Sequence, residues 1–355
     1  MALVSGRRRG LVAGLERCGL SILAGLYRAG LAVHDLRWNL ASAVAEAPCL
    51  VISVGNLTVG GTGKTPMVAY LARLLTGMGR RPLIVSRGYG SIGGELNEEA
   101  RELLALCPDV PHVQNPDRLQ AILEWTAANP CDAVILDDGF QHRRLARDLD
   151  LVMIDAMQPF GYGHVLPRGL LREPKSALAR ADFVVITRAE LVDAVEVTRI
   201  KRTVPHYAHP NTPVVVAEHR PTGLILSDGS RCAVDWLDHQ DVAAACGIGN
   251  PEAFRWTLRQ AGANVRLFNV FADHHAYTAG ELQRLLTAAE AAGLKTLVTT
   301  GKDYVKWHPI IAGMTPVPPV RVAALEVAMK IVEGEEILRN RIQALLSARA
   351  NTRRP

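Results

Sequence analysis

The residues Gly63, Lys64 and Thr65 have the types and spacing of a phosphate-binding loop. They end the glycine-rich stretch ISVGNLTVGGTGKTP, residues 52–66. In such a loop, backbone N–H groups surround phosphate oxygens, the lysine reaches the β- and γ-phosphates, and the threonine hydroxyl binds Mg²⁺. The strict pattern has glycine five residues before Gly63, where this chain has Thr58. At this point the stretch can be interpreted either as a nucleotide-binding loop or as a glycine-rich turn.

The segments on either side of the stretch favour the nucleotide loop. CLVISVG before it is continuously apolar and has the length of a strand, and TPMVAYLARLLTGMG after it has helical periodicity. A loop between a strand and a helix N-terminus suits phosphate, because the helix dipole attracts anions. We therefore expect nucleotide binding by Thr58, Val59, Gly60, Gly61, Thr62, Gly63, Lys64 and Thr65.

Two consecutive carboxylates form the second candidate feature. Asp137 and Asp138 follow the apolar run AVIL, and a strand-end carboxylate beside a phosphate loop commonly holds the Mg²⁺ of a nucleotide. Taken alone, the pair is better explained as an acidic turn after a buried strand. Successive side chains of an extended chain point to opposite faces. We therefore expect Asp137, with Thr65, nearer to Mg²⁺, and Asp138 directed toward metal-bound water or substrate.

The remaining pattern indicates an α/β protein. RPLIVSRG, LDLVMIDA and ADFVVITR are further continuous apolar runs, and they alternate with helical patterns such as DRLQAILEWTAANP. Continuous apolarity predicts strands buried on both faces of a parallel sheet. The sequence thus predicts a P-loop NTPase-like, doubly wound, mainly parallel sheet. The α/β pattern pauses at AEHRPTGLILSDGSR, residues 217–231, and resumes from VAAACGIGN to the C-terminal helix of EEILRNRIQALLSARA.

These patterns divide the chain into three expected parts. Residues 1–45 form an N-terminal helical region, residues 46–220 a P-loop domain, and residues 221–355 a second, smaller α/β domain that closes over the first. The chain has 355 residues, of which 48% are hydrophobic, enough for two domains with real cores. Six cysteines without a Cys-x-x-Cys pair favour scattered thiols over a disulfide or zinc framework.

The charge favours an anionic partner without naming it. A net charge of +5 and a pI near 9.0 suit phosphorylated substrates or anionic lipid surfaces. Aromatic residues make up only 5% of the chain, which disfavours base-stacking platforms for nucleic acid.

The N-terminal segment predicts an amphipathic helix. Apolar residues recur at helical spacing at Leu11, Leu15, Cys18, Ile22, Leu26 and Val33. The uncharged run from Cys18 to Tyr27 is half of the roughly 20 residues that a spanning helix needs, and no clear cleavage site follows it. We expect the helix to lie in a membrane interface with its arginines toward anionic headgroups. The alternative is a helix packed on its own domain with arginines at the surface.

The motifs together resemble one family. GNLTVGGTGKTP, SRGYG, DDGFQHRRLARDLD, LPRGLLREP, GIGNPEAF, DHHAYT and TGKDYVKW occur, within about residues 11 to 310, in the order seen in tetraacyldisaccharide 4′-kinases. That family has threonine or serine at the position of Thr58. The resemblance implies transfer of the ATP γ-phosphate to the 4′-hydroxyl of a tetraacylated glucosamine disaccharide 1-phosphate, in lipid A biosynthesis. It also implies Mg²⁺ and a monotopic enzyme on the cytoplasmic face of the bacterial inner membrane.

The resemblance further implies two α/β/α domains joined by a short β linker, with catalysis in the cleft between them. In the family an aspartate pairs with a histidine of the Asp-His-His segment, here Asp273–His275, to take up the hydroxyl proton. This chain departs there, because Glu98 stands at the aspartate position. We expect Glu98 and His274 to act together, with Glu99 and His275 as the alternatives.

The expected catalytic set is therefore Glu98, His274, Asp138 and Lys64. We expect substrate contacts from Arg87, Tyr89, Arg118, His142, Arg172 and Glu173. Lys302 and Asp303 weakly resemble the nucleotide-specificity patch of GTPases. The alternative function is thus a P-loop GTPase or ATPase, acting as a switch or assembly factor without a lipid acceptor.

Overall fold

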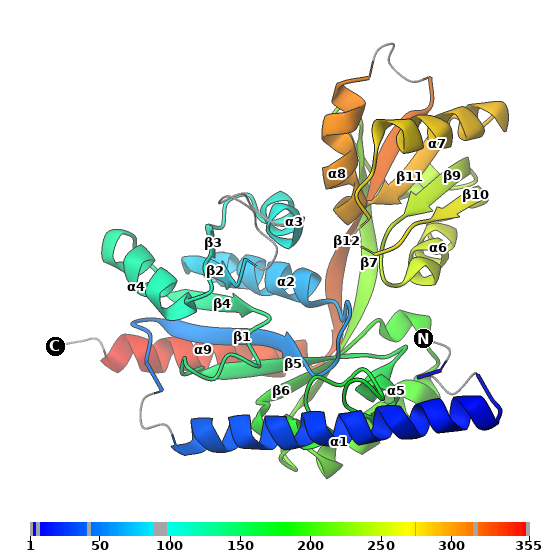
Figure 1. Cartoon of the computed structure of the whole chain (residues 1–355). Helices are drawn as coiled ribbons and strands as arrows, with labels where there is room; N and C mark the ends of the chain where they lie inside the picture. The colour runs from blue at the N-terminus through cyan, green and yellow to red at the C-terminus, as the bar shows by residue number, and fades with distance from the viewer. Residues whose placement is uncertain are drawn as a thin grey trace. The chain divides into compact units, whose positions relative to one another are not determined.

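The computed structural model describes residues 3–4, 8–40, 44–88, 98–273, 275–314 and 319–352. The chain divides into two compact units (Figure 1). Unit 1 comprises Met1–Leu96, Leu106–Glu218 and Ile331–Pro355, and unit 2 comprises Asn97–Ala105 and His219–Lys330. Two long strands, β7 (Val214–Leu226) and β12 (Arg321–Glu333), carry the chain from unit 1 into unit 2 and back.

Unit 1 contains a parallel sheet whose strands lie in the order β7-β6-β5-β1-β4-β2-β3. Its further strands are β1 (Leu50–Asn56), β2 (Pro82–Ser86), β3 (His112–Gln114), β4 (Ala133–Asp137), β5 (Leu149–Asp155) and β6 (Phe183–Thr187). Every residue of β1, β2, β4 and β6 is buried. The sequence-based prediction of a parallel sheet covered on both faces is confirmed.

Helices cover this sheet. They are α1 (Leu11–Leu40), α2 (Lys64–Gly77), α4 (Arg118–Ala128), α5 (Ala194–Thr203) and α9 (Glu335–Thr352). On one side, Ala121 and Ile122 of α4 pack with Val51, Val134 and Leu136 of the sheet. A separate cluster joins Val152 and Ile154 of β5 to β6, α5 and α1. The alternation of side chains along each strand supplies both faces with apolar residues.

Unit 2 is a second α/β unit. Its strands β9 (Asp241–Cys246), β10 (Asn264–Val270) and β11 (Thr296–Thr300) are parallel to one another and β11 is parallel to β12, while the short β8 (Arg231–Cys232) pairs antiparallel with β7. Its helices are α6 (Pro251–Gln260), α7 (Ala279–Ala291), α8 (Gly301–Ala312) and most of α3 (Glu98–Leu106). Trp307 of α8 is fully buried among α7 and the strands.

The path of the chain between the units differs from the expectation in two respects. The segment 217–231 is largely strand, because β7 runs through Pro221 to Leu226, and β7 changes its pairing partner from β6 to β8 across that proline. Residues 331–355, expected in the second domain, group with unit 1. The reason is that α9 packs there, where Arg349 forms an ion pair with Asp148 at 2.8 Å and Tyr70 donates to Glu335 at 2.7 Å.

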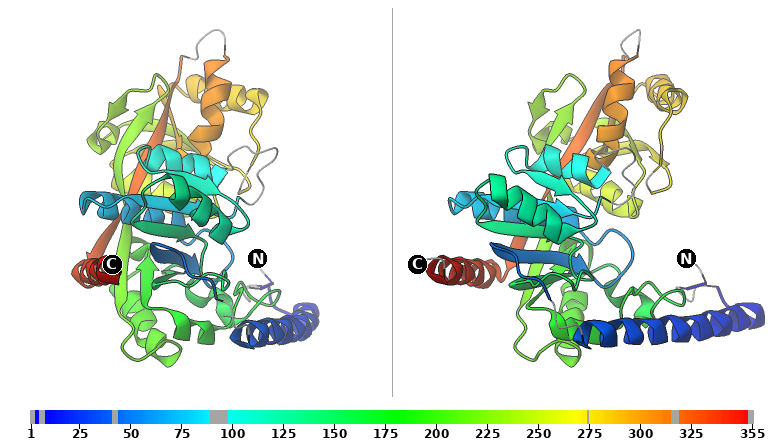
Figure 2. Two further views of the ribbon diagram at one scale, coloured as in Figure 1. Left: turned by 90° about the vertical axis from the view of Figure 1, so that its left-hand side faces the viewer. Right: turned by 60° about the vertical axis from the view of Figure 1, so that its left-hand side comes forward.

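The N-terminal helix α1 lies along unit 1, beside β5, β6 and α5 (Figures 1 and 2). It packs through small residues, since Ala13 and Ala24 are its buried apolar side chains among those described. The apolar stripe predicted from the sequence is exposed: Leu11, Leu15, Ile22, Leu26 and Val33 are between 64% and 91% exposed. None of the described helices has the length and apolarity that crossing a membrane requires.

Candidate active site

The loop between β1 and α2 has the backbone of a phosphate-binding loop. Gly60 and Gly63 have φ values of 109° and 83°, a conformation that L-residues other than glycine rarely adopt. Gly63 is the N-cap of α2, so Lys64 and Thr65 form its first turn. The hydroxyl of Thr187 at the end of β6 donates to the carbonyl of Thr62 at 2.9 Å. The loop therefore places its backbone at a helix N-terminus, where anions are favoured.

Thr58 has a structural role that explains the missing glycine. Its φ is not positive, and it forms an antiparallel bridge with Leu171. The next residue, Val59, donates its N–H to the carbonyl of Leu170 at 2.8 Å, and Arg172 donates to Leu57 at 2.6 Å. The start of the phosphate loop is thus paired like a short strand, and position 58 does not need the positive φ that glycine adopts readily.

The segment that pairs with the loop is shaped by an unusual turn, η1 (Pro159–Gly163). Phe160, Gly161 and Tyr162 have φ values of 59°, 50° and 62°. Left-handed backbone at the two non-glycine residues, Phe160 and Tyr162, costs about 1–2 kcal/mol each, and surrounding contacts must hold it. Here the carbonyl of Gly161 accepts a hydrogen bond from Leu170 at 2.9 Å. The turn therefore presents residues 170–172 to the phosphate loop.

Lys64 and Asp138 meet at the end of β4. The ammonium of Lys64 lies 3.4 Å from Asp138 Oδ1 and donates to Asn56 Oδ1 at 3.2 Å. Arg172 donates through NH1 to Asp138 Oδ2 at 2.9 Å. Asp138 thus receives one cation on each carboxylate oxygen, and its side chain is 38% exposed. Lys64, Arg172 and Asp138 therefore lie together within unit 1.

The backbone around Asp138 is held in a sharp turn. Asp138 has a φ of 51°, and buried Arg118 donates to its carbonyl at 3.0 Å. Gly139 follows, and a Cβ there would lie 2.7 Å from Ser53 Oγ, so only glycine fits. Arg118 was expected to contact substrate. In the structure it supports the turn that orients Asp138.

The electrostatics keep Asp138 ionised and His142 neutral. Burial acts to raise the pKa of Asp138, but Lys64 and Arg172 outweigh it, so the pKa lies below its ordinary value. Burial, followed by repulsion from Arg118 and other arginines, lowers the pKa of His142 to about 4. At neutral pH His142 is therefore a neutral imidazole that can donate or accept a hydrogen bond.

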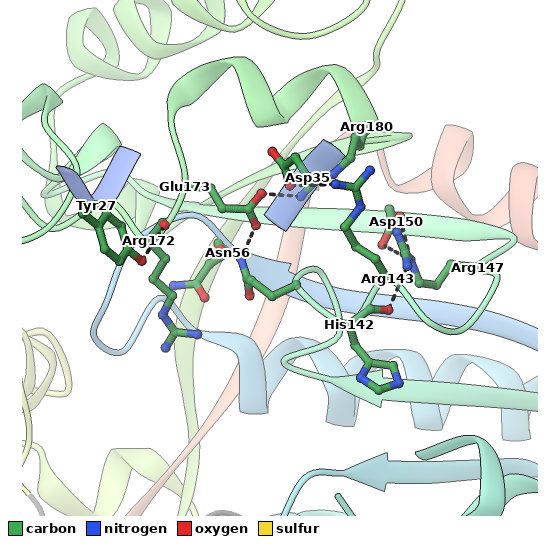
Figure 3. A network of polar contacts seen from close by, with 11 residues as sticks. Tyr27, Asp35, Asn56, His142, Arg143, Arg147, Asp150, Arg172, Glu173 and Arg180 are labelled. Carbon is green, nitrogen blue, oxygen red and sulfur yellow. Dashed lines mark hydrogen bonds and ion pairs between the residues drawn. The ribbon is translucent and has the colours of Figure 1, made fainter. Parts of the chain in front are cut away.

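Glu173 lies in a network behind the phosphate loop (Figure 3). Its carboxylate accepts from Gln141 at 2.9 Å and from Arg180 at 2.8 Å. Gln141 also donates to the carbonyl of Asn56 at 2.9 Å, and the Arg180 guanidinium lies over the Phe140 ring at 4.3 Å. Glu173, expected at the substrate, is buried in these contacts and connects the 138–142 loop to Asn56.

The residues expected to hold Mg²⁺ fit that ion by their chemistry. Asp137 is buried at the end of β4, in register with Val54 of β1, and Thr65 is in the first turn of α2. Within the described residues, no three His, Cys, Asp or Glu side chains gather as a metal cluster. Mg²⁺ at nucleotide sites needs only one or two carboxylates, with phosphates and waters completing its shell. Oxygen donors from Asp137, Asp138 and Thr65 match that requirement.

Other expected substrate residues are placed only in part. Arg87 directly follows β2 and is exposed, and its charge contributes to lowering the pKa of Arg118, after burial, which is the main cause. Tyr89 lies outside the described residues. Arg188, which the sequence analysis did not single out, forms an ion pair with Asp155 and lies beside Gly61 of the phosphate loop.

In unit 2, three motif segments leave the same edge of the sheet. GIGNPEAF follows β9, DHHAYT follows β10 and TTGKDYVKW ends β11 and begins α8, and the carboxyl ends of parallel strands share one edge. Asp303 joins these segments. Its carboxylate accepts from Gly247 N at 3.0 Å, Tyr277 OH at 2.9 Å and Thr300 Oγ1 at 2.7 Å.

Asp303 is completely buried, so it does not present a carboxylate to a nucleotide base as the GTPase comparison suggested. Burial, followed by the negative charge of Asp303, raises the pKa of Tyr277. The phenol therefore stays protonated and continues to donate its hydrogen bond. We conclude that Asp303 fixes the relative placement of the three segments.

Of the histidine segment Asp273–His275, the structure describes Asp273 and His275. Asp273 forms an ion pair with Lys302 at 3.0 Å, and His275 Nε2 lies 3.2 Å from Glu281 Oε1. His274 and the side chain of Glu98 lie outside the described residues; the backbone of Glu98 begins α3. The expected pairing of Glu98 with His274 thus stays a prediction, while His275 is engaged by Glu281.

No sequence motif predicted a role for Asn56, Gln141 and Arg180, which connect the phosphate loop to the 138–142 loop and to Glu173. Asn56 carried a usable signal, because it is a polar residue at the buried end of β1. Gln141 and Arg180 carried none, since their partners are far away in sequence.

Comparison with known proteins agrees with this geometry. A model of the family described as tetraacyldisaccharide-1-P 4′-kinase matches residues 17–347. A tetraacyldisaccharide 4′-kinase of Anaeromyxobacter sp. (strain K) is 36% identical over 96% of this chain and 94% of its own length. That of Geobacter metallireducens is 42% identical over 74% of this chain and 80% of its own length.

A solved structure shows the same relationship. The crystal structure of the LpxK protein of Aquifex aeolicus in complex with ATP covers 93% of this chain and 99% of its own length, with a TM-score of 0.72 and 29% identity. The match includes both α/β units, as its coverage requires. By its sequence motifs, its fold and these comparisons, the chain belongs to the tetraacyldisaccharide-1-P 4′-kinase family.

Proposed function

We propose that this chain transfers the γ-phosphoryl group of ATP to the 4′-hydroxyl of a tetraacylated glucosamine disaccharide 1-phosphate, a step of lipid A biosynthesis. Family membership over almost the whole chain supports this activity. The observation that carries the proposal is the placement of Lys64 and Arg172 on the two oxygens of Asp138, beside the phosphate loop. Two cations beside a nucleotide loop suit a reaction in which negative charge develops on transferring oxygens.

The residues of unit 1 have distinct roles in this proposal. Backbone N–H groups from Gly60 to Thr65 bind the β- and γ-phosphates. The ammonium of Lys64 then leaves Asn56 and Asp138 and contacts the phosphates. Both side chains and the phosphates lie within the reach of the Lys64 side chain. Arg172 keeps Asp138 ionised and in place. Such preorganised charges cost no reorganisation during the reaction.

Mg²⁺ is part of the proposal, with Thr65, Asp137 and Asp138 as its protein ligands. When bound, the ion would neutralise charge on the β- and γ-phosphates and help to align them. Asp138, with the greater exposure and the cationic neighbours, is the carboxylate that faces the reacting groups. Asp137, buried at the strand end, is directed to the ion.

The hydroxyl of a sugar must lose a proton during attack on phosphorus. We assign its uptake to Glu98 with His274, on the family resemblance alone. Glu99 and His275 stay the alternatives, although the contact of His275 with Glu281 gives it a structural role. Substitution of Glu98 by Gln decides the assignment: activity at the wild-type level excludes this carboxylate as the base.

The outward apolar stripe of α1 supports a peripheral membrane location, proposed here as the cytoplasmic face of the inner membrane. An amphipathic helix of this kind lies in the interface, with its apolar side chains in the acyl boundary and its cations among anionic headgroups. The lipid acceptor is presented in the same layer. Removal of anionic lipid from vesicles should therefore lower binding of the protein.

The proposal is tested with the purified full chain, Mg-ATP and vesicles that contain the tetraacylated disaccharide 1-phosphate. The expected result is a bisphosphorylated lipid with the new phosphate at the 4′ position. A rival P-loop switch predicts instead that nucleotide is hydrolysed equally with and without the lipid and that no lipid is phosphorylated. That outcome would overturn the proposed function.

A further inference from the structure

Two polar side chains of α1 contact the loops that carry candidate active-site residues (Figure 3). The phenol of Tyr27 donates to the backbone carbonyl of Arg172 at 2.9 Å. Asp35 Oδ1 accepts a hydrogen bond from Arg143 NH1 at 2.7 Å. The two residues are separated by about 12 Å along the helix axis, and they reach different loops.

Arg172 connects Tyr27 of α1 to the centre of the site. Its N–H donates to the carbonyl of Leu57 at 2.6 Å, at the entrance of the phosphate loop. Its guanidinium donates to Asp138 at 2.9 Å. One residue is thus bonded to α1, to the phosphate loop and to the strand-end carboxylate. Because the peptide unit is planar and stiff, holding the carbonyl of Arg172 also restricts the position of its side chain.

Arg143 connects Asp35 of α1 to the loop that contains Asp138 and His142. It is the neighbour of His142 in the loop that begins at Asp138. The far side of this loop is anchored by Arg147, which donates to the carbonyl of His142 at 2.9 Å. The Arg143 side chain is 17% exposed, so its ion pair with Asp35 is partly shielded from solvent, and shielding makes such a pair stronger than one in open solvent.

We propose that α1 is a positioning element for the phosphoryl-transfer centre, in which Tyr27 sets Arg172 and Asp35 sets the loop of Asp138 and His142. The inference rests on the proposed function, because it treats Asp138 as the centre of the reaction. It adds that the helix which binds the membrane also fixes the geometry of the site. Tyr27 and Asp35 are positioning residues, because they act through Arg172 and Arg143. Burial and the nearby Glu173 raise the pKa of Tyr27, so its phenol donates at every physiological pH.

The variant Tyr27→Phe removes the donor and leaves the ring. An exposed hydrogen bond of ordinary strength corresponds to about twofold to fivefold in a rate. We expect kcat for the vesicle-borne lipid to fall by that factor, with the KM for ATP and the fraction of protein bound to vesicles unchanged. Ser21→Ala is the matched control, because the Ser21 hydroxyl bonds only within α1, to the Arg17 carbonyl at 2.8 Å. Full activity of Tyr27→Phe would overturn the proposal.

Combined variants separate positioning from a general structural effect. If Tyr27 acts through the Arg172 side chain, Tyr27→Phe should cause no further loss in an Arg172→Ala background, whereas independent effects multiply. An equal further loss in that background contradicts the inference. Asp35→Asn should lower kcat on its own, and together with Tyr27→Phe the two losses should multiply to about tenfold, because the two contacts reach separate loops.

Hydrogen exchange tests the contact without any turnover. The Arg172 amide is bonded to Leu57, and loss of the Tyr27 contact should make it exchange about threefold faster in Tyr27→Phe than in Ser21→Ala. Unchanged exchange overturns the positioning role, whatever the activity. A wild-type protein that forms no 4′-phosphorylated lipid would instead overturn the proposed function, and the exchange experiment would still decide whether α1 holds the loop.

Discussion

Asp138 in unit 1 and Asp303 in unit 2 are both carboxylates just beyond a strand of a parallel sheet, and their surroundings are opposite. Asp138 meets two cations, Lys64 and Arg172, and its side chain is 38% exposed. Asp303 is completely buried and accepts only from neutral donors, an N–H and two hydroxyls. The first keeps its charge accessible beside a phosphate loop, and the second uses its charge to hold three segments together.

The difference teaches how to separate a reacting carboxylate from a structural one. The position in the fold does not distinguish them, because the carboxyl edge of a parallel sheet attracts both kinds. The partners distinguish them. Contacts between charged side chains and a partly exposed carboxylate can be exchanged for contacts with substrate and metal, whereas the donors around a buried carboxylate cannot leave without a large desolvation cost.

The largest expected effect is that of Lys64→Ala. Loss of a preorganised charge at the phosphates should lower kcat by about 10³-fold, with the fold intact because Arg172 still pairs with Asp138. Phosphate transfer to the lipid measures the rate. Lys201→Ala is the control, since Lys201 forms an exposed ion pair with Glu333, and it should be fully active. Activity of Lys64→Ala near that of the control would remove the loop from catalysis.

Asp138→Asn should follow, with kcat lower by about 10²-fold. The amide keeps the shape of the side chain but loses the charge between Lys64 and Arg172. Binding of a fluorescent ATP analogue without Mg²⁺ should change little, because the backbone of the phosphate loop is untouched. A loss that appears only as weaker nucleotide binding would show that Asp138 supports the loop and not the transfer.

Asp303→Asn should mainly affect stability within unit 2. In this variant one carboxylate oxygen becomes an NH₂ group, so one of the three donors to Asp303 loses its acceptor. An unsatisfied buried donor costs about 1–3 kcal/mol. Amide hydrogen exchange should therefore accelerate in peptides that contain Gly247 and Tyr277, and not in unit 1. Unchanged protection of both peptides would show that the three segments are held by other contacts.

The smallest expected effect concerns His142 and acid. The pKa of His142 is about 4 in the fold and about 6.5 in an unfolded chain. Between these values the unfolded state binds more protons, so stability falls as the pH falls through this window. His142→Gln should remove the share of this acid-induced loss of stability that comes from His142. That share is at most about 2 kcal/mol after allowance for solvent screening. Urea midpoints at about pH 7.5 and 5.0 compare the two proteins; an equal acid loss in both would assign it to other groups.

The sequence was sufficient for the strands and for the composition of the site in unit 1. Continuous apolar runs predicted β1, β2, β4, β5 and β6 within about two residues, because burial on both faces leaves no polar position. Thr58 was the ambiguous residue, and its pairing with Leu171 explains why no local pattern identified it. The partner lies more than a hundred residues further along the chain.

The parts that the sequence did not predict depend on distant contacts. Helix α8 contains Pro309, which disfavours helix by local propensity, and its motif suggested a nucleotide-specificity patch instead. The left-handed turn of Phe160 and Tyr162 is accompanied by a hydrogen bond from the Leu170 N–H to the Gly161 carbonyl, a contact that the local sequence does not specify. The contact of Arg172 with Asp138 likewise joins two loops that only the folded sheet brings together.

The most direct test of the comparison measures lipid 4′-phosphorylation by Asp138→Asn and Asp303→Asn side by side, per amount of folded protein. We expect Asp303→Asn to keep at least about a tenth of the wild-type kcat and Asp138→Asn to keep about a hundredth or less. Equal kcat values for the two variants, or a greater loss in Asp303→Asn, would contradict the assignment of Asp138 to the reaction and of Asp303 to the fold.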